Sequence, residues 1–390
     1  MKIGSSRETW IEISLDNVEN NIKNFKKLLS SDTALMAVVK ADGYGHGAKE
    51  IAETAIKAGA TYLAVAFLDE AVVLRKAGFS IPILVLGYTS LDTETIEKAI
   101  DYGLTLTVYS KEAVESIQQL ADQKKKVCRI HLKIDSGMNR IGVRTAEEAL
   151  QVVASITSDY LLLEGVFTHF ADADAIESTF VHEQFSHFMH IVSEIQQAGY
   201  TIPIKHCCNT AATIAYPEMH LDMVRIGIGL YGLYPEQHLQ DHIELKPAMT
   251  FKTKPILIKK VPAGQSVSYG RTYTTTVDSI IATIPVGYAD GFSRALSNNG
   301  NVTLDGHKVP IVGRVCMDQT MVDLSEIDPV HFDKEIILFG DPKDNCISIS
   351  EVAAQMNTIH YEVACLVGKR VPRVYLNHNK VISATGLVKP

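Results

Sequence analysis

A lysine at the end of an apolar run is the first residue of this sequence that could do chemistry. The run "ALMAVVK" (34–40) ends in Lys40, and Gly43, Gly45 and Gly47 follow it. Burial disfavours the charged ammonium form, so a desolvated lysine can act as an amine nucleophile or as a base. A lysine that ends a strand also commonly reaches solvent, and glycines after a strand commonly form a turn. These residues alone leave a functional and a structural interpretation open.

Seven further apolar runs follow the first one, and longer amphipathic stretches separate them. The runs are rich in Val, Ile and Leu: "YLAVAF" (62–67), "IPILVLG" (81–87), "LTLTVY" (104–109), "VCRIHLKI" (127–134), "LLLEGVFTH" (161–169), "IPIKHC" (202–207) and "DMVRIGI" (222–228). Alternating strands and helices predict a parallel sheet, and eight such units within about 200 residues fit a (β/α)8 TIM barrel. The alternative is a doubly wound open sheet, but "GYGHG" lacks the GxGxxG spacing of a nucleotide-binding turn.

The residue pattern of the sequence changes after residue 245, where helical patterns become rare. Residues 250–292 are rich in Val, Ile, Thr and Tyr and are interrupted by Pro and Gly, and a D-G turn joins strand-like segments within residues 301–315. Such patterns are typical of β structure. We therefore expect a barrel domain at residues 12–245 and a mostly β domain at residues 246–390, which residues 1–11 join.

Charged and polar residues gather where five of the predicted barrel strands end. They are Lys40 with Tyr44, Lys133 with Arg140, His169, Asn209 with Thr210, and Arg225 with Gly227. In barrels of this kind the active site lies at the carboxyl ends of the strands. Five strands that place such groups on one rim predict a shared site.

Composition restricts the partners and the compartment. The 390 residues carry a net charge of −8 without a long charged block, which argues against nucleic acid and anionic membranes as partners. No apolar stretch approaches the ~20 residues of a membrane span, and the first residues lack the apolar core of a signal peptide. The six cysteines form no CxxC pair, and "HEQFSH" (182–187) is one residue too long for the metalloprotease helix motif. We expect a cytoplasmic protein without a metal.

Motifs along nearly the whole chain resemble those of the alanine racemase family. In order they are "VVKADGYGHG", "HLKIDSGMNRIG", "THFA", "VRIGIGLYG", "VSYGRTY", "VGYADGF", "VCMDQ" and "HYEV", and the resemblance runs from about Ile11 to Tyr375. It implies a homodimer with active sites shared between subunits and the cofactor pyridoxal 5′-phosphate, bound by the barrel. It also implies interconversion of L-alanine and D-alanine, which supplies D-alanine for peptidoglycan.

The resemblance assigns two bases to the reaction. Lys40 would form a Schiff base with the cofactor and then act as a base on one face of the substrate's α-carbon. Tyr269 of the partner subunit would be the base on the opposite face, with His169 and Arg225 as its relay. Arg225 would also face the pyridine nitrogen of the cofactor. For Arg225 the structural alternative is an ion pair with Asp222.

The resemblance also assigns binding residues. The cofactor and its phosphate would contact Tyr44, His169, Asn209, Thr210, Arg225, Gly227, Ile228 and Tyr361. Arg140 and the backbone of Met317 would bind the substrate carboxylate, and Tyr288 with Tyr361 would narrow the entrance. Lys133 is expected to be carbamylated, since two crowded cations, Lys133 and Arg140, would otherwise repel each other.

Three other functions compete with this assignment. The chain could racemise another amino acid, such as serine, or a broad range of them. A decarboxylase is disfavoured by Arg225, because the decarboxylase relatives place a carboxylate there. A non-catalytic carrier of the cofactor is disfavoured by residues 246–390, because carriers of this fold lack the β domain.

Overall fold

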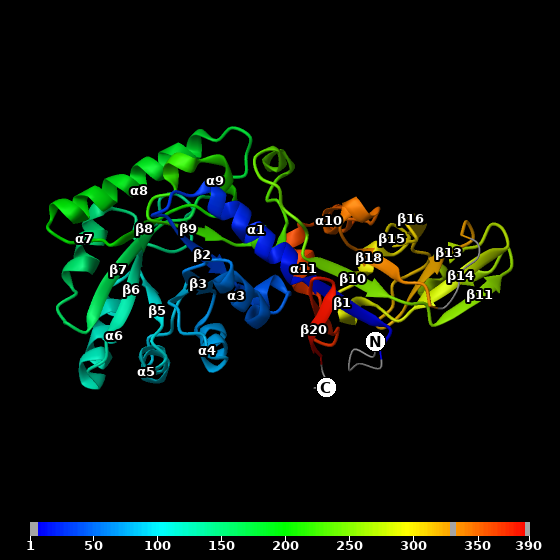
Figure 1. The fold of residues 1–390 in the computed structure, drawn as a ribbon, viewed down its shortest axis with the longest axis horizontal. Coiled ribbons are helices and arrows are strands. Elements are labelled where there is room, and N and C mark those ends of the chain that lie inside the picture. The colour runs from blue at the N-terminus through cyan, green and yellow to red at the C-terminus, as the bar shows by residue number, and fades with distance from the viewer. Residues whose placement is uncertain (1–6, 328–332, 387–390) are drawn as a thin grey trace. The chain divides into compact units, whose positions relative to one another are not determined.

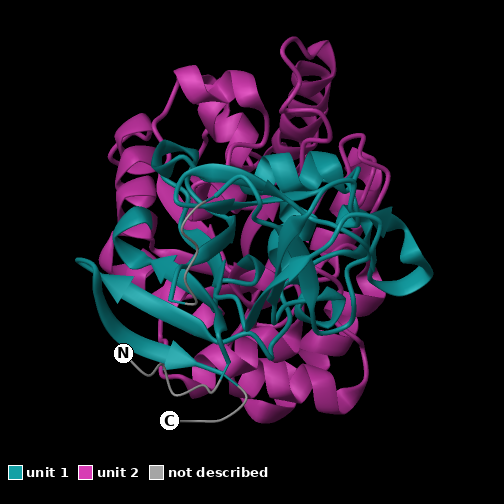
Figure 2. Cartoon of the chain, turned by 90° about the vertical axis from the view of Figure 1, so that its right-hand side faces the viewer, with its two compact units in different colours: residues 1–17, 44–47, 246–390 teal, residues 18–43, 48–245 magenta. Residues whose placement is uncertain are grey.

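Contacts along the chain define two units in the computed structural model, which describes residues 7–327 and 333–386 (Figure 2). The barrel unit comprises Val18–Gly43 and Ala48–Leu245. The β-rich unit comprises the chain up to Asn17, Tyr44–Gly47, and the chain from Lys246 onward. Tyr44–Gly47 therefore belongs to a different unit from the lysine that it follows.

Eight parallel strands form the core of the barrel unit, in the order β8-β7-β6-β5-β4-β3-β2-β9. Their bounds are β2 (Ala34–Val38), β3 (Tyr62–Val65), β4 (Ile83–Val85), β5 (Thr105–Val108), β6 (Cys128–Lys133), β7 (Leu161–Phe167), β8 (Ile204–His206) and β9 (Met223–Ile226). Backbone hydrogen bonds bring the two ends of this order together, from Asp222 N to the Lys205 carbonyl (3.1 Å) and from Arg225 N to the Cys208 carbonyl (3.0 Å). The expected barrel is confirmed, and the open sheet is rejected.

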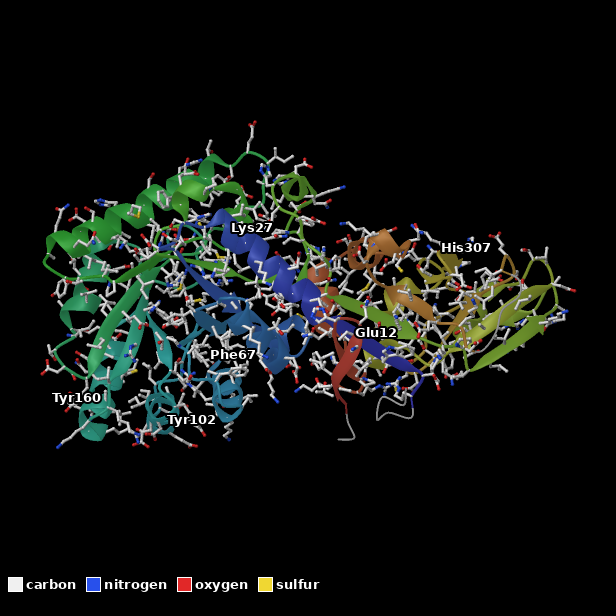
Figure 3. The ribbon with its side chains drawn as sticks, viewed as in Figure 1. Glu12, Lys27, Phe67, Tyr102, Tyr160 and His307 are labelled. Carbon is white, nitrogen blue, oxygen red and sulfur yellow. The ribbon has the colours of Figure 1, made fainter. Side chains whose placement is uncertain are left out.

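Helices surround these strands (Figure 1). Their bounds are α1 (Leu15–Leu28), α3 (Ala48–Lys57), α4 (Leu68–Lys76), α5 (Thr93–Asp101), α6 (Lys111–Lys124), α7 (Ala146–Ala154), α8 (Thr179–Gln197) and α9 (Thr210–Ala215). In α1, Val18, Ile22 and Phe25 are fully buried, whereas Lys27 lies on the exposed face (Figure 3). This spacing of apolar residues is that of an amphipathic helix. Among the described residues, no helix has the length and apolar character needed to cross a bilayer.

The β-rich unit contains three sheets. The largest has the order β16-β15-β18-β10-β1-β19-β20, the second β11-β14-β17, and the third β12-β13. The strands of the first are β1 (Thr9–Ser14), β10 (Met249–Thr253), β15 (Asn301–Leu304), β16 (His307–Pro310), β18 (Ile336–Phe339), β19 (Arg373–Asn377) and β20 (Lys380–Thr385). Those of the others are β11 (Leu257–Val261), β12 (Ser266–Val267), β13 (Tyr273–Thr274), β14 (Ser279–Ile284) and β17 (Thr320–Asp323), and the unit adds helices α10 (Ile349–Gln355) and α11 (His360–Leu366).

Two details of this unit follow from its sequence. Asp305 and Gly306 both have positive φ (48° and 80°), as the predicted D-G hairpin turn between β15 and β16 requires. Strand β1 spans the domain boundary expected near residue 12, and it pairs antiparallel with β10 and parallel with β19.

Candidate active site

Lys40 lies at the start of an unusual turn, α2 (Lys40–Tyr44), directly after β2. Ala41, Asp42 and Gly43 all have left-handed backbone angles, with φ of 53°, 53° and 63°. This conformation costs roughly 1–2 kcal/mol for each residue with a Cβ atom. Strained backbone of this kind is concentrated at functional sites, where surrounding contacts maintain it.

Two carboxylates hold the turn in place. Glu70 in α4 accepts a hydrogen bond from Ala41 N (2.6 Å), and its other oxygen accepts from Ala66 N (2.8 Å). Asp42 accepts from Ala48 N (2.9 Å). Sequence analysis did not identify Glu70; a glutamate three residues into a helix that directly follows a strand is the available signal.

Arg225 is a buried cation whose hydrogen bonds go to neutral groups. One terminal nitrogen donates to His206 Nδ1 (2.9 Å) and to the His206 carbonyl (3.1 Å). The other donates to the carbonyls of Thr168 (2.8 Å) and Cys207 (2.9 Å) and to His169 Nδ1 (3.2 Å). Burial lowers the pKa of Arg225 to about 10, so it stays protonated at neutral pH.

The alternative ion pair between Arg225 and Asp222 is not formed. Asp222 instead accepts from Lys205 Nζ at 2.7 Å and from the Lys205 backbone N at 2.7 Å. The positive charge of Arg225 is therefore left available to a ligand.

Lys133 ends β6 and is buried beside Arg225. Its Nζ atom lies 4.7 Å from the centre of the Phe167 ring, and it forms no ion pair with any residue in the described part of the chain. Desolvation, together with the charges of Arg225 and Arg140, holds the pKa of Lys133 well below its ordinary value. This environment favours the neutral amine over the ammonium form.

The loop that carries Arg140 is organised by Asp135. The Asp135 carboxylate accepts hydrogen bonds from the backbone N–H groups of Gly137 (3.1 Å), Asn139 (2.9 Å) and Arg140 (2.9 Å). Sequence analysis did not single out Asp135, although an aspartate before Ser-Gly is a recognisable turn signal.

His169 lies close enough to several charged rim residues for their charges to act on it. Desolvation lowers its pKa well below the ordinary value, and the charges of Arg225, Lys133, Arg140 and Lys40 lower it further. The barrel therefore brings four of the predicted cationic residues around a neutral imidazole, as the positions of the strand ends indicate.

Thr210 and the backbone after β9 form a second part of the rim. Thr210 Oγ1 accepts from Gly227 N (3.0 Å) and, more weakly, from Gly229 N (3.5 Å). A Cβ atom at Gly229 would lie 2.5 Å from the Phe25 ring, so only glycine fits there. Ile228 begins the short helix Ile228–Tyr231. The Asn209 side chain caps α9, where it accepts from Ala212 N (2.9 Å).

In the β-rich unit, Tyr44 and Tyr361 lie close together. Their ring centres are 6.4 Å apart. Arg373 Nε donates to the Gly45 carbonyl (3.1 Å), and a Cβ atom at Gly45 would lie 2.3 Å from the Ala364 carbonyl oxygen. The segment Tyr44–Gly47 is therefore held against α11, which carries Tyr361.

The remaining predicted residues, Tyr269, Tyr288 and Met317, are exposed on the same unit. Their exposed fractions are 72%, 43% and 52%. Tyr288 N donates to the Cys316 carbonyl (3.0 Å) and Ala289 N to the Met317 carbonyl (3.1 Å), which joins the two loops.

A buried carboxylate, Asp290, fixes the loop that carries Tyr288. It accepts from both terminal nitrogens of Arg7 (2.7 and 3.0 Å), from Arg370 Nε (2.7 Å) and from Gly287 N (3.0 Å). Sequence analysis did not identify this cluster, because Arg7, Asp290 and Arg370 lie far apart along the chain.

Comparisons with known proteins cover both units. The chain matches the family described as "Alanine racemase, N-terminal domain" over residues 13–235 and "Alanine racemase, C-terminal domain" over residues 248–375. A curated relative, "Alanine racemase 2" of Oceanobacillus iheyensis, is 54% identical over 99% of this chain and 98% of its own length.

Solved structures agree with this match. The alanine racemase from Bacillus anthracis with bound L-Ala-P is 39% identical, with a TM-score of 0.93 over 98% of both chains. A histidine racemase from Leuconostoc mesenteroides is 30% identical, with a TM-score of 0.84 over 95% of this chain and 99% of its own. The architecture is therefore shared by racemases named for different amino acids.

Proposed function

This chain belongs to the alanine racemase family, and from that membership we propose that it interconverts L-alanine and D-alanine. The observation that carries the proposal is the 54% identity, over nearly the whole chain, to a protein named for this activity. The cationic rim of the barrel supports the proposal, because cations can bind the carboxylate group of an amino acid.

The family generally uses pyridoxal 5′-phosphate, and the residues of the barrel unit fit this anionic group. Arg225 is a buried cation that has no carboxylate partner within the described ranges, so an anion would balance its charge. The Thr210 hydroxyl accepts from the backbone N–H of Gly227, so its own proton is available to donate to a phosphate, as hydroxyls do in other phosphate sites. When bound, the cofactor supplies an electron sink for the carbanion formed at the α-carbon of an amino acid.

Lys40 and Tyr269 would move protons on opposite faces of that carbon. Lys40 would also hold the cofactor through Nζ, and its release on substrate binding would free the amine to act as the base. Both tasks would require a neutral amine. Tyr269 of the partner subunit would need a lowered pKa, since an ordinary phenol titrates near about 10.

His169 has the hydrogen-bonding pattern needed to assist Tyr269. Arg225 donates to its Nδ1 atom, so the proton of the neutral ring lies on Nε2. An Nε2–H donor stabilises a phenolate more than a phenol, which lowers the pKa of a tyrosine that it contacts.

Arg225 would control the protonation of the pyridine nitrogen. A guanidinium group has donors and no acceptor, so it cannot hold a proton on that nitrogen. Arg225 would thereby keep the electron sink weaker, which would cost rate and discourage transamination.

Arg225→Glu should therefore increase transamination relative to racemisation. A carboxylate stabilises the protonated ring, which strengthens the electron sink. The measurement is the yield of pyruvate and of the amine form of the cofactor, compared with the yield of D-alanine from L-alanine. Arg225→Lys is the matched control, because lysine also lacks an acceptor and should not raise the side reaction. An unchanged ratio in Arg225→Glu would mean that residue 225 does not face the ring nitrogen.

The family motifs also suggest residues for substrate recognition. Arg140 and the backbone of Met317 would bind the carboxylate of alanine. Tyr288 and Tyr361 would narrow the entrance, which suits a small side chain.

Carbamylation of Lys133 is expected, because burial and the nearby charges of Arg225 and Arg140 favour its neutral amine. Attack of the neutral Nζ on carbon dioxide, with loss of one proton to solvent, forms a carbamate anion that can orient Arg140. Protein incubated with ¹³C-labelled bicarbonate should show a carbamate signal in its ¹³C NMR spectrum. Lys133→Ala should lack that signal. High-resolution density for a bare ammonium group at ordinary carbon dioxide would contradict the idea.

We further propose a homodimer in the cytoplasm that supplies D-alanine for peptidoglycan, without nucleic acid or membrane as a partner. The exposed Tyr269, Tyr288 and Met317 support the dimer, because large side chains on a surface are available to a second subunit. The cysteine usage supports a reducing compartment. The proposed domains are residues 12–245 and 246–390.

The activity is tested by chiral chromatography after incubation with a panel of L-amino acids. Alanine should give the highest turnover, together with the visible absorption of lysine-bound cofactor. A higher turnover with histidine, serine or a larger amino acid would show that the chain is a racemase of that amino acid instead. Bound cofactor without any turnover would favour a carrier.

A further inference from the structure

A continuous chain of hydrogen bonds runs from Arg225 into the interior of the barrel. Arg225 donates to His206 Nδ1 (2.9 Å). His206 Nε2 lies 2.8 Å from His131 Nδ1, and His131 Nε2 lies 3.2 Å from Glu164 Oε2. Both imidazoles are fully buried. The chain therefore links a rim residue to a carboxylate through two rings that solvent does not reach.

Only one arrangement of protons satisfies this chain. Arginine can only donate, so His206 Nδ1 must accept, and a neutral His206 carries its proton on Nε2. His131 Nδ1 then accepts that proton, and His131 donates its own Nε2–H to Glu164. Desolvation lowers the pKa of both imidazoles, which agrees with neutral rings. Every donor in the chain thus points from Arg225 towards Glu164.

Glu164 is held as an anion at the other end of the chain. Tyr62 Oη donates to Glu164 Oε2 (2.5 Å) and accepts from Thr105 Oγ1 (2.8 Å). Arg129 Nε lies 3.2 Å from Glu164 Oε1. Burial raises the pKa of Glu164, but hydrogen bonds from His131 and Tyr62 outweigh it, and the net shift is downward.

The backbone of β7 is shaped to place this carboxylate. Ile130 of β6 pairs with Leu163 and His131 pairs with Gly165, so Glu164 is the extra residue of a β-bulge. Bulges commonly redirect a side chain next to an active site. A Cβ atom at Gly165 would lie 2.8 Å from the His131 ring, so glycine leaves the space that this ring occupies.

We propose that Glu164 is a positioning residue of the racemase site, which acts through His131 and His206 to keep a hydrogen-bond acceptor facing Arg225. Its effect on turnover rests on the proposed function, whereas its effect on the two imidazoles does not. Without an acceptor at residue 164, the Nε2–H group of His131 has no hydrogen-bond partner there, so the Nε2–H form is no longer stabilised. A shift of that proton to Nδ1 would place it opposite the Nε2–H of His206. If the proton of His206 then moved from Nε2 to Nδ1 to relieve this clash, its Nδ1–H donor would face the N–H donors of Arg225.

The first experiment reads the imidazoles directly. Full-length protein labelled with ¹⁵N-histidine is examined by NMR, with His131→Asn and His206→Asn used for assignment. Wild-type protein should show both rings as neutral Nε2–H forms. Glu164→Gln should keep this pattern, because the amide oxygen still accepts. Glu164→Leu should lose it at His131 and give mixed proton positions.

Arg129→Gln is the matched control, because it removes the charge beside Glu164 Oε1 and leaves the contact between Oε2 and His131. It should keep the wild-type pattern. An Nδ1–H form of either ring in the wild-type protein would overturn the proposal, whether or not any variant folds. So would an unchanged pattern in folded Glu164→Leu, or an equal change in Arg129→Gln.

The second experiment measures turnover of alanine. Glu164→Leu should lower kcat by about tenfold with little change in KM, a loss in the range seen when a group behind a metal-ligating histidine is removed. Glu164→Gln should recover most of it. A loss of stability with unchanged kcat would reduce Glu164 to a structural residue and overturn the proposal. Normal imidazole signals in a protein that does not racemise alanine would instead reject the proposed function alone.

Discussion

Lys40→Ala should lose the visible absorption of bound pyridoxal phosphate and essentially all racemisation of alanine. In the proposed reaction, Lys40 Nζ would bond the aldehyde carbon and would also serve as the base on one face. Removing it should lower kcat by at least about 10⁴-fold, the upper end of what one positioned base contributes. The measurement combines a visible spectrum of the purified protein with chiral analysis of the products in both directions.

The control for this variant is Lys49→Ala, which removes an exposed lysine in α3 and should leave spectrum and turnover unchanged. Lys133 is the competing amine, since it is buried at the same rim with a strongly lowered pKa. An unchanged spectrum in Lys40→Ala would transfer the covalent role to Lys133 and refute the assignment of Lys40.

The barrel and the cluster at its rim could be predicted because their signals are local. Parallel strands buried on both faces appear as short apolar runs, and the residue that ends each run lies at the same edge of the barrel. This is why the order of residues along the chain was enough to place Lys40, Lys133, His169 and Arg225 together. Motifs shared with a family added proposed roles for Tyr269, Tyr361 and Met317, which no periodicity predicts.

Several groups that hold the predicted residues in place were missed because their signals are not local. Glu70 acts on Ala41 across 29 residues, and Arg7 acts on Asp290 across 283 residues. The left-handed angles of Ala41 and Asp42 depend on such contacts, since neither residue type favours them in isolation. The bulge at Glu164 is set by its register with β6, which a single strand's sequence does not contain. The alternative ion pair between Arg225 and Asp222 is absent for the same reason, because Asp222 pairs with Lys205 of the neighbouring strand.

Lys40→Ala and Tyr269→Ala should each be nearly inactive alone and should restore activity when they are combined in one dimer. In the proposed dimer each site takes Lys40 from one subunit and Tyr269 from the other. A mixed dimer then has one site that lacks both bases and one that retains both. This expectation follows from closed two-fold symmetry, in which two equivalent sites are formed by the same pair of surfaces.

The size of the recovery tests the shared site quantitatively. Random pairing of equal amounts makes half of the dimers mixed, and half of the sites in these are intact, so about a quarter of wild-type activity per site should return. The variants are co-expressed with different affinity tags, and the mixed dimers are purified through both tags and assayed with L-alanine. These purified dimers should reach about half of wild-type activity, since one of their two sites is intact. Homodimers that are cross-linked before mixing serve as the control and should stay inactive, because recovery requires exchange of subunits. If doubly tagged dimers bind cofactor and yet show no activity, Lys40 and Tyr269 must act within one chain, and the shared site is wrong.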